Sequence, residues 1–167
     1  MEETNQDNPY NLPVSLTTLG ECAFQNCTGI TRVCLPEGVT VVPRYAFNGC
    51  TKLNGVVLSK QTATIEDWAF AGTALTGISL LATVTSLGDN VFHNCSELIG
   101  VQSYPATAPT ITATTFSHDK GTIKEQCRLF VLPTASSAYD SWKNYFKAVV
   151  ADSVSYTHLT LPTIRLV

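Results

Sequence analysis

The stretch "ECAFQNC", residues 21–27, places a small apolar residue beside a large one between polar neighbours. It recurs as "RYAFNGC" at 44–50 and "DWAFAGT" at 67–73. When the repeats are aligned, five phenylalanines occupy one equivalent position, which we call a column: Phe24, Phe47, Phe70, Phe92 and Phe116. A period of 22–24 residues indicates a repeat architecture, in which one supersecondary unit is copied along the chain.

Other apolar residues keep fixed distances from each phenylalanine. Five residues before it stand Leu19, Val42, Ile65, Leu87 and Ile111. A later column holds Ile30, Leu53, Leu75 and Leu98, and Cys127 continues it after an insertion within 117–126. Alternating apolar positions follow that column and predict a short strand in each unit. The residues expected to point inward are Val33, Leu35, Val56, Leu58, Ile78, Leu80, Val101, Phe130 and Leu132.

A unit of this size cannot bury its own apolar columns, so it has to stack on its neighbours. Stacking sets equivalent residues about 4.8 Å apart, and each column becomes a row inside the molecule. The phenylalanines then fill the interior opposite the strands, while the small alanine beside each one lets neighbouring coils approach closely. The sequence therefore predicts an α/β repeat solenoid of about five units. We expect a parallel sheet on one face and short helical or irregular turns on the other.

The stretch from Pro36 to Leu58 reads P-x-x-V-T-x-V-x-x-x-A-F-x-x-C-x-x-L-x-x-V-x-L. It resembles the BspA-like class of leucine-rich repeats, and the resemblance extends over residues 10–133. Residues 129–146, "LFVLPTASSAYDSWKNYF", resemble the closing segment of that family, where a strand and a proline lead into a capping helix. The resemblance implies a right-handed solenoid on a bacterial or protozoan cell surface. It also implies adhesion or host-protein binding as the usual role.

Four segments follow from these patterns. Residues 1–9 form a polar N-terminal segment, 10–133 hold the repeats with an incomplete first coil, and 134–150 form a C-terminal capping helix. The tail at 151–167 lies outside the repeat and is either a non-native sequence or, given its alternation, a genuine strand. We leave it out of the fold prediction.

Composition excludes two classes of partner. The chain carries 10 Lys and Arg against 13 Asp and Glu, a net charge of -3, without the clustered cations that nucleic acid requires. No apolar run approaches the ~18 residues of a membrane span. The first residues lack the basic and apolar regions of a signal peptide, so none is expected in this segment.

Six cysteines raise the question of disulfides or metal. Cys27, Cys50 and Cys95 share one column, which predicts a buried row of small side chains, although Cys27 and Cys50 are near enough to leave a bridge open. Cys127 occupies a core position. Cys22 and Cys34 point outward and are open to reaction. No C-x-x-C or paired-histidine spacing occurs, so neither a metal nor a cofactor is expected.

No residue pattern predicts catalysis. His93, His118 and His158 are expected to be solvated, and Glu66 and Asp67 to be polar cover. The triplet "SHD" at 117–119 has the residue types of a hydrolase triad, but neighbours in sequence rarely converge into one. We therefore expect a protein that is not an enzyme.

Two surfaces remain as candidates for binding. The outward strand positions carry little charge and include Gly55, Gly77 and Gly100, which either admit a partner backbone or only relieve crowding on a curved sheet. The residues expected to face a partner are Arg32, Val57, Ser79, Gln102, Leu129 and Val131. Tyr45 and Trp68 are expected to stack as a partly exposed row or to form a platform for a sugar.

The leading hypothesis is a monomeric adhesion module of a cell-surface protein that binds another protein, such as a host surface protein, through its sheet face. The alternative is a structural spacer that presents another domain.

Overall fold

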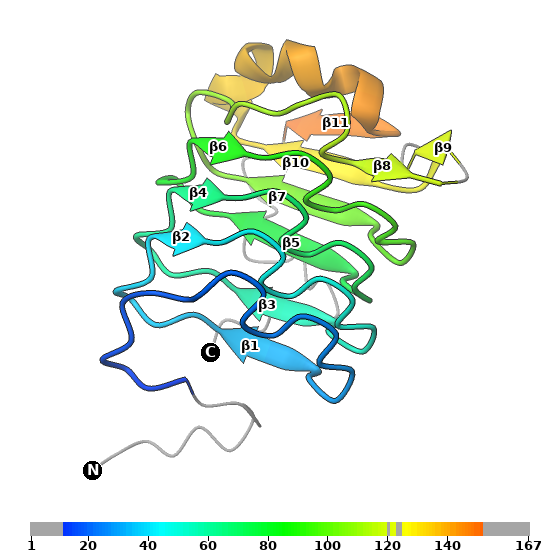
Figure 1. The fold of residues 1–167 in the computed structure, drawn as a ribbon. Coiled ribbons are helices and arrows are strands. Elements are labelled where there is room, and N and C mark those ends of the chain that lie inside the picture. The colour runs from blue at the N-terminus through cyan, green and yellow to red at the C-terminus, as the bar shows by residue number, and fades with distance from the viewer. Residues whose placement is uncertain (1–11, 120, 123–124, 152–167) are drawn as a thin grey trace.

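A computed structural model describes residues 12–119, 121–122 and 125–151, and shows a stack of similar coils (Figure 1). Each main strand comes from one predicted position: β1 (Arg32–Cys34), β3 (Gly55–Val57), β5 (Gly77–Leu80), β7 (Gly100–Ser103) and β10 (Arg128–Val131). The paired strands are parallel, as predicted. Their hydrogen bonds form two sheets, β1–β3 and β5–β7–β10–β11.

A second row of strands forms another side of each coil. It contains β2 (Val41–Val42), β4 (Thr64–Ile65) and β6 (Ser86–Leu87), which form a three-stranded parallel sheet. Their inward residues belong to the aliphatic column five residues before each phenylalanine. Turns were predicted at these positions, because a strand of two residues is too short to show alternation in the sequence.

The phenylalanine row is confirmed. Successive rings stack with centroids 5.3, 5.5, 6.1 and 5.4 Å apart, and their planes lie within 10° of parallel. Phe47, Phe70 and Phe92 are fully buried, whereas Phe24 at the first coil is half-buried. The repeat period therefore produces a continuous aromatic core.

The Ala-Phe turns are bonded from coil to coil. The amide of Phe24 donates to the carbonyl of Ala46 at 2.8 Å, and the amide of Phe47 donates to Ala69 at the same distance. Positive φ values flank the pair, as at Tyr45 (57°) and Gly49 (73°). Glycine adopts the positive φ at position 49 without strain, and a Cβ there would require the Asn26 side chain to move.

The C-terminal end departs from the prediction. A 3-10 helix, η2 (Pro133–Tyr145), is followed by a strand, β11 (Ala148–Ala151), that pairs in parallel with β10. The predicted helix over 134–150 is therefore wrong in its last residues. The β-branched pair Val149 and Val150 suits a strand, and β10 would otherwise end the sheet with unpaired backbone groups.

The insertion after Phe116 forms an antiparallel hairpin of β8 (Ser117–His118) and β9 (Gly121–Thr122), which projects from the stack (Figure 1). It also changes the phase of the next strand. Leu129 and Val131 are fully buried and Phe130 lies opposite Gln102, so the predicted orientation of 129–132 is wrong. A shift of one residue moves every side chain of a strand to the opposite face.

Candidate functional site

The outward face of the main strands keeps four of the six residues predicted to contact a partner. Arg32 lies opposite Gly55, and Ser79 lies opposite Gln102, by the strand register. Val57 and Ser79 are partly exposed, whereas Gln102 is only 4% exposed and accepts a hydrogen bond from Ser79 Oγ at 2.7 Å. The other two, Leu129 and Val131, point into the core. Exposure on this face is thus concentrated toward β1, β3 and β5.

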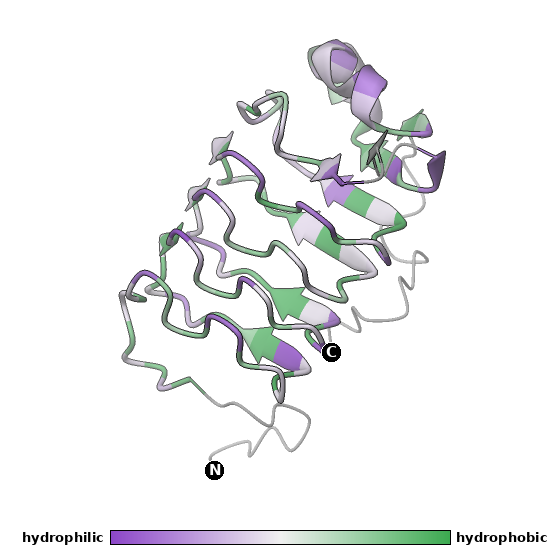
Figure 2. Ribbon diagram, turned by 45° about the vertical axis from the view of Figure 1, so that its right-hand side comes forward, coloured by the Kyte–Doolittle hydropathy of each residue, from purple (hydrophilic) through white to green (hydrophobic). Residues whose placement is uncertain are grey.

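An apolar groove lies on this part of the molecule, beside the carboxyl ends of β1 and β3. It has a volume of about 220 Å³ and is lined by Leu35, Glu37, Val56, Val57, Leu58, Lys60, Ser79 and Leu81. The ribbon is hydrophobic along the same strand ends (Figure 2). The sequence indicated Val57 and Ser79, but it did not indicate Glu37, Lys60 or Leu81, which lie beyond the strands.

Two charges stand at the rim of the groove. Glu37 and Lys60 are both exposed and come from adjacent coils. Among the ion pairs of the described residues, none joins Glu37 to Lys60. An apolar floor with charges of both signs at its edge resembles the centre and rim of a protein interface.

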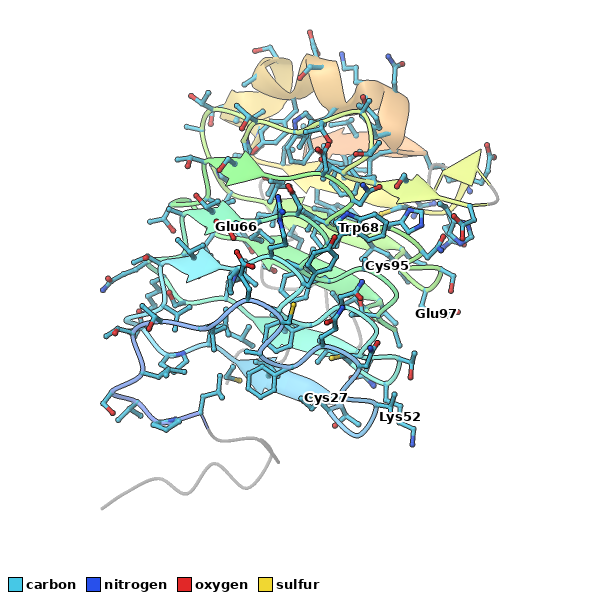
Figure 3. The ribbon with its side chains drawn as sticks, in the orientation of Figure 1. Cys27, Lys52, Glu66, Trp68, Cys95 and Glu97 are labelled. Atoms are coloured by element: carbon cyan, nitrogen blue, oxygen red, sulfur yellow. The ribbon has the colours of Figure 1, made fainter. Side chains whose placement is uncertain are left out.

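A second, polar hollow of about 450 Å³ includes Glu21, Arg44, Glu66 and Asp67. Figure 3 labels Glu66. Arg44 Nη2 donates to Asp67 Oδ2 at 2.7 Å, and Glu66 Oε2 accepts the amide hydrogen of Arg44 at 3.0 Å. The bond to Asp67 and its negative charge raise the pKa of the Arg44 guanidinium. Glu66 and Asp67 are therefore not simply solvated, because they join neighbouring coils.

Tyr45 and Trp68 stack as predicted, with ring centroids 6.2 Å apart and an angle of 21°. The imidazole of His93, from the following coil, meets Trp68 at 5.1 Å and 61°. Trp68, which is labelled in Figure 3, thus stacks on Tyr45 and makes an edge contact with His93. This arrangement argues against a sugar platform at Trp68.

The expectation of a solvated histidine is wrong for His93. Its side chain is 18% exposed, its Nδ1 lies 2.7 Å from Ser117 Oγ, and its Nε2 lies 3.2 Å from Asp119 Oδ1. Ser117 and Asp119 thus converge on a histidine of the preceding coil. The Ser117 hydroxyl donates to Asn90 Oδ1 at 2.9 Å, which does not activate it as a nucleophile. His158 lies outside the described residues.

The cysteine column is buried in the middle of the stack. Its members Cys50 and Cys95 are 0% exposed and Cys27 is half-buried. Cys127, which belongs to the column of Ile30 and Leu53, is also 0% exposed, and all six cysteines are free. Figure 3 labels Cys27 and Cys95. Cys50 Sγ donates to the carbonyl of Phe24 at 3.0 Å, and Cys95 Sγ donates to that of Phe70 at 3.1 Å. Thr73 replaces cysteine in the same column and donates to Phe70 at 2.9 Å. Side chains of this column thus donate hydrogen bonds to backbone carbonyl groups inside the turns.

We expect Cys50, Cys95 and Cys127 to resist a thiol reagent in the native protein. Burial raises the pKa of Cys50 and Cys95 to about 11 and that of Cys127 to about 12, so thiolate is scarce at pH 8. Maleimide labelling followed by peptide mass spectrometry should modify exposed Cys22 first and these three only in urea. Equal labelling of Cys22 and Cys95 without urea would contradict the buried column.

Neither a clear metal centre nor a membrane helix is found in the described part of the chain. Over residues 12–119, 121–122 and 125–151, no group of three or more His, Cys, Asp or Glu is placed to hold a metal ion. Over the same ranges, no helix has the length and apolar character needed to cross a membrane.

Comparison with solved structures supports the same architecture. A leucine-rich repeat protein from T. pallidum is 29% identical with a TM-score of 0.62, and the match covers 71% of this chain and 56% of that one. A leucine-rich cell surface protein from Faecalibacterium prausnitzii is 24% identical with a TM-score of 0.52, covering 77% of this chain and 39% of that one. The pneumococcal vaccine antigen PcpA is 18% identical with a TM-score of 0.65, covering 89% and 43%.

The chain therefore spans between 39% and 56% of the length of these three structures. A comparison with curated proteins gave no match. The family model for the BspA type leucine-rich repeat region matches residues 4–122 in six copies. With its stacked strands, buried phenylalanine row and this match over most of its length, the chain belongs to the BspA-type leucine-rich repeat family.

Proposed function

We propose that this chain is a non-enzymatic, monomeric module of a cell-surface protein that binds a protein partner through its sheet face. The observation that supports this most is the apolar groove beside β1, β3 and β5. Its lining combines Leu35, Val57 and Leu81 with the unjoined charges of Glu37 and Lys60. A few well-packed residues that lose their water near the centre of an interface supply most of the binding free energy.

The cell-surface location rests on family membership and on the Faecalibacterium neighbour, which is described as a cell surface protein. A host extracellular or surface protein is the partner class that we propose for such a module. The alternative function is a spacer that presents another domain. The regular stacking of coils supports it, because each added coil lengthens the molecule without needing a ligand.

Introducing one charge into the apolar groove tests whether the sheet face binds the partner. Val57→Glu should weaken binding to any immobilised extracellular-matrix protein that the wild type binds by at least tenfold, since it places a carboxylate in the apolar groove. Val41→Glu is the matched control, because Val41 is 37% exposed on β2, in the other row of strands. Surface plasmon resonance against a panel of matrix proteins measures both variants.

Equal affinity of Val57→Glu and wild type for every matrix protein bound would exclude the groove as the binding site. If the wild type binds no member of the panel, the spacer function is favoured. Circular dichroism melting of both variants distinguishes loss of binding from loss of fold.

A further inference from the structure

We propose that His93 is a pH-sensitive latch that holds the β8–β9 hairpin against the turn of the preceding coil. The hairpin belongs to the insertion that interrupts the repeat before β10. The contacts at its base are made by side chains of the His93 turn. This proposal does not depend on the proposed function.

Three residues of that turn, Asn90, His93 and Asn94, contact the start of the hairpin. The amide of Asn94 donates to the carbonyl of Ser117 at 3.2 Å, which continues the ladder of the other turns. The Asn94 side chain adds two bonds, because Nδ2 donates to Asp119 Oδ2 at 2.7 Å and Oδ1 accepts the Asp119 amide hydrogen at 2.9 Å. His93 contacts Ser117 Oγ and Asp119 Oδ1, and Asn90 Oδ1 accepts a hydrogen bond from Ser117 Oγ.

Both ring nitrogens of His93 face acceptors. The Ser117 hydroxyl hydrogen is directed to Asn90 Oδ1, so Ser117 Oγ accepts from Nδ1. Asp119 Oδ1 is a carboxylate oxygen and accepts from Nε2. Only the imidazolium form carries an N–H on both nitrogens, whereas neutral imidazole has one donor and one acceptor.

The Trp68 ring also packs against the imidazole. The two ring centroids lie 5.1 Å apart and the planes meet at 61°, which is an edge contact. Asp119 and Ser117 are therefore the two groups placed to accept from the imidazolium form.

Two carboxylates near the latch, Asp89 and Asp119, also accept hydrogen bonds from neighbouring side chains. Asp89 accepts a hydrogen bond from Thr114 Oγ1 at 2.9 Å, and bonds from threonines lower its pKa. The hydrogen bond from Asn94 is the largest cause that lowers the pKa of Asp119, and the charges of His93 and His118 lower it further. Asp119 thus stays ionised through the range in which histidines gain a proton.

The latch should be complete in a window of pH. Histidine side chains titrate in the range of about pH 5–8, and above it the imidazole loses one of its two donors. Far below it Asp119 becomes protonated and its charge is lost. Between these limits the hairpin should be held most firmly, and 0.5 M salt should weaken the contact because Asp119 is 72% exposed.

Solvent exchange of backbone amides, followed by NMR, tests the latch in the whole chain. We expect the protection factors of the Asn94 and Asp119 amides to fall by about threefold between pH 5.5 and pH 8. In His93→Gln, which keeps a hydrogen-bonding side chain but does not titrate, the fall should disappear.

A second variant covers the case in which His93→Gln alters the turn itself. Asp119→Asn removes the charge without changing the His93 turn, and it should also reduce the fall in protection. A threefold fall that persists in both His93→Gln and Asp119→Asn would overturn the proposal. So would wild-type protection that does not change between the two pH values.

Discussion

Replacing Phe47 with alanine should lower the free energy of unfolding by about 3–5 kcal/mol. Phe47 is 0% exposed and stacks on Phe24 at 5.3 Å and on Phe70 at 5.5 Å. Its loss leaves a cavity between three coils, and the backbone bonds between the turns limit how far the coils can collapse into it. In a repeat protein each coil depends on its neighbours, so one cavity weakens two interfaces.

Urea unfolding followed by circular dichroism measures this loss. Phe24→Ala is the matched control, because Phe24 is half-buried at the first described coil and its loss opens a smaller cavity. We expect it to cost less than Phe47→Ala. Equal stability of Phe47→Ala and wild type would contradict a continuous aromatic core.

Replacing Trp142 with alanine should cost a similar amount, about 3–5 kcal/mol, but at one end of the molecule. Trp142 is 1% exposed, and its ring lies 5.7 Å from that of Phe116. Its Nε1 donates to the carbonyl of Pro109 at 3.3 Å. The substitution removes one of the rings that cover Phe116, the last ring of the row, and leaves the Pro109 carbonyl without its indole donor.

In Trp142→Ala, stability should be lost first at the C-terminal end of the stack and only later in the whole protein. Stability in a stack of coils is the sum of intrinsic and nearest-neighbour contributions, so β10 and β11 should exchange amide hydrogens faster than β3 in Trp142→Ala. Tyr145→Ala is the control, since Tyr145 is only half-buried and more distant from Phe116, at 6.4 Å. Uniform acceleration along the whole chain would contradict this end-first order.

Much of the architecture could be predicted because spacing in a solenoid corresponds directly to contact. Residues one period apart, such as Phe47 and Phe70 or Tyr45 and Trp68, become neighbours once the coils stack. The same rule predicted the buried Cys50 and Cys95. It failed where the period is broken: the insertion changed the phase at Leu129, which moved it from the expected surface into the core.

The candidate site was predicted less completely than the fold. Val57 and Ser79 were expected on the sheet face, but the groove also needs Glu37, Lys60 and Leu81, whose side chains meet only after the coils are stacked. Likewise, nothing in the spacing of His93 indicated that Asp119 would reach it across the insertion.

By itself, the sequence determined the repeat, the strand positions and the aromatic core of this protein. These depend on a hydrophobic periodicity that any stacked arrangement must bury. Only the tertiary structure decided the second row of strands, the pairing of β11, the apolar groove and the His93 latch. Those features depend on short hydrogen bonds and on local shape between coils, which a linear pattern of apolar residues does not encode.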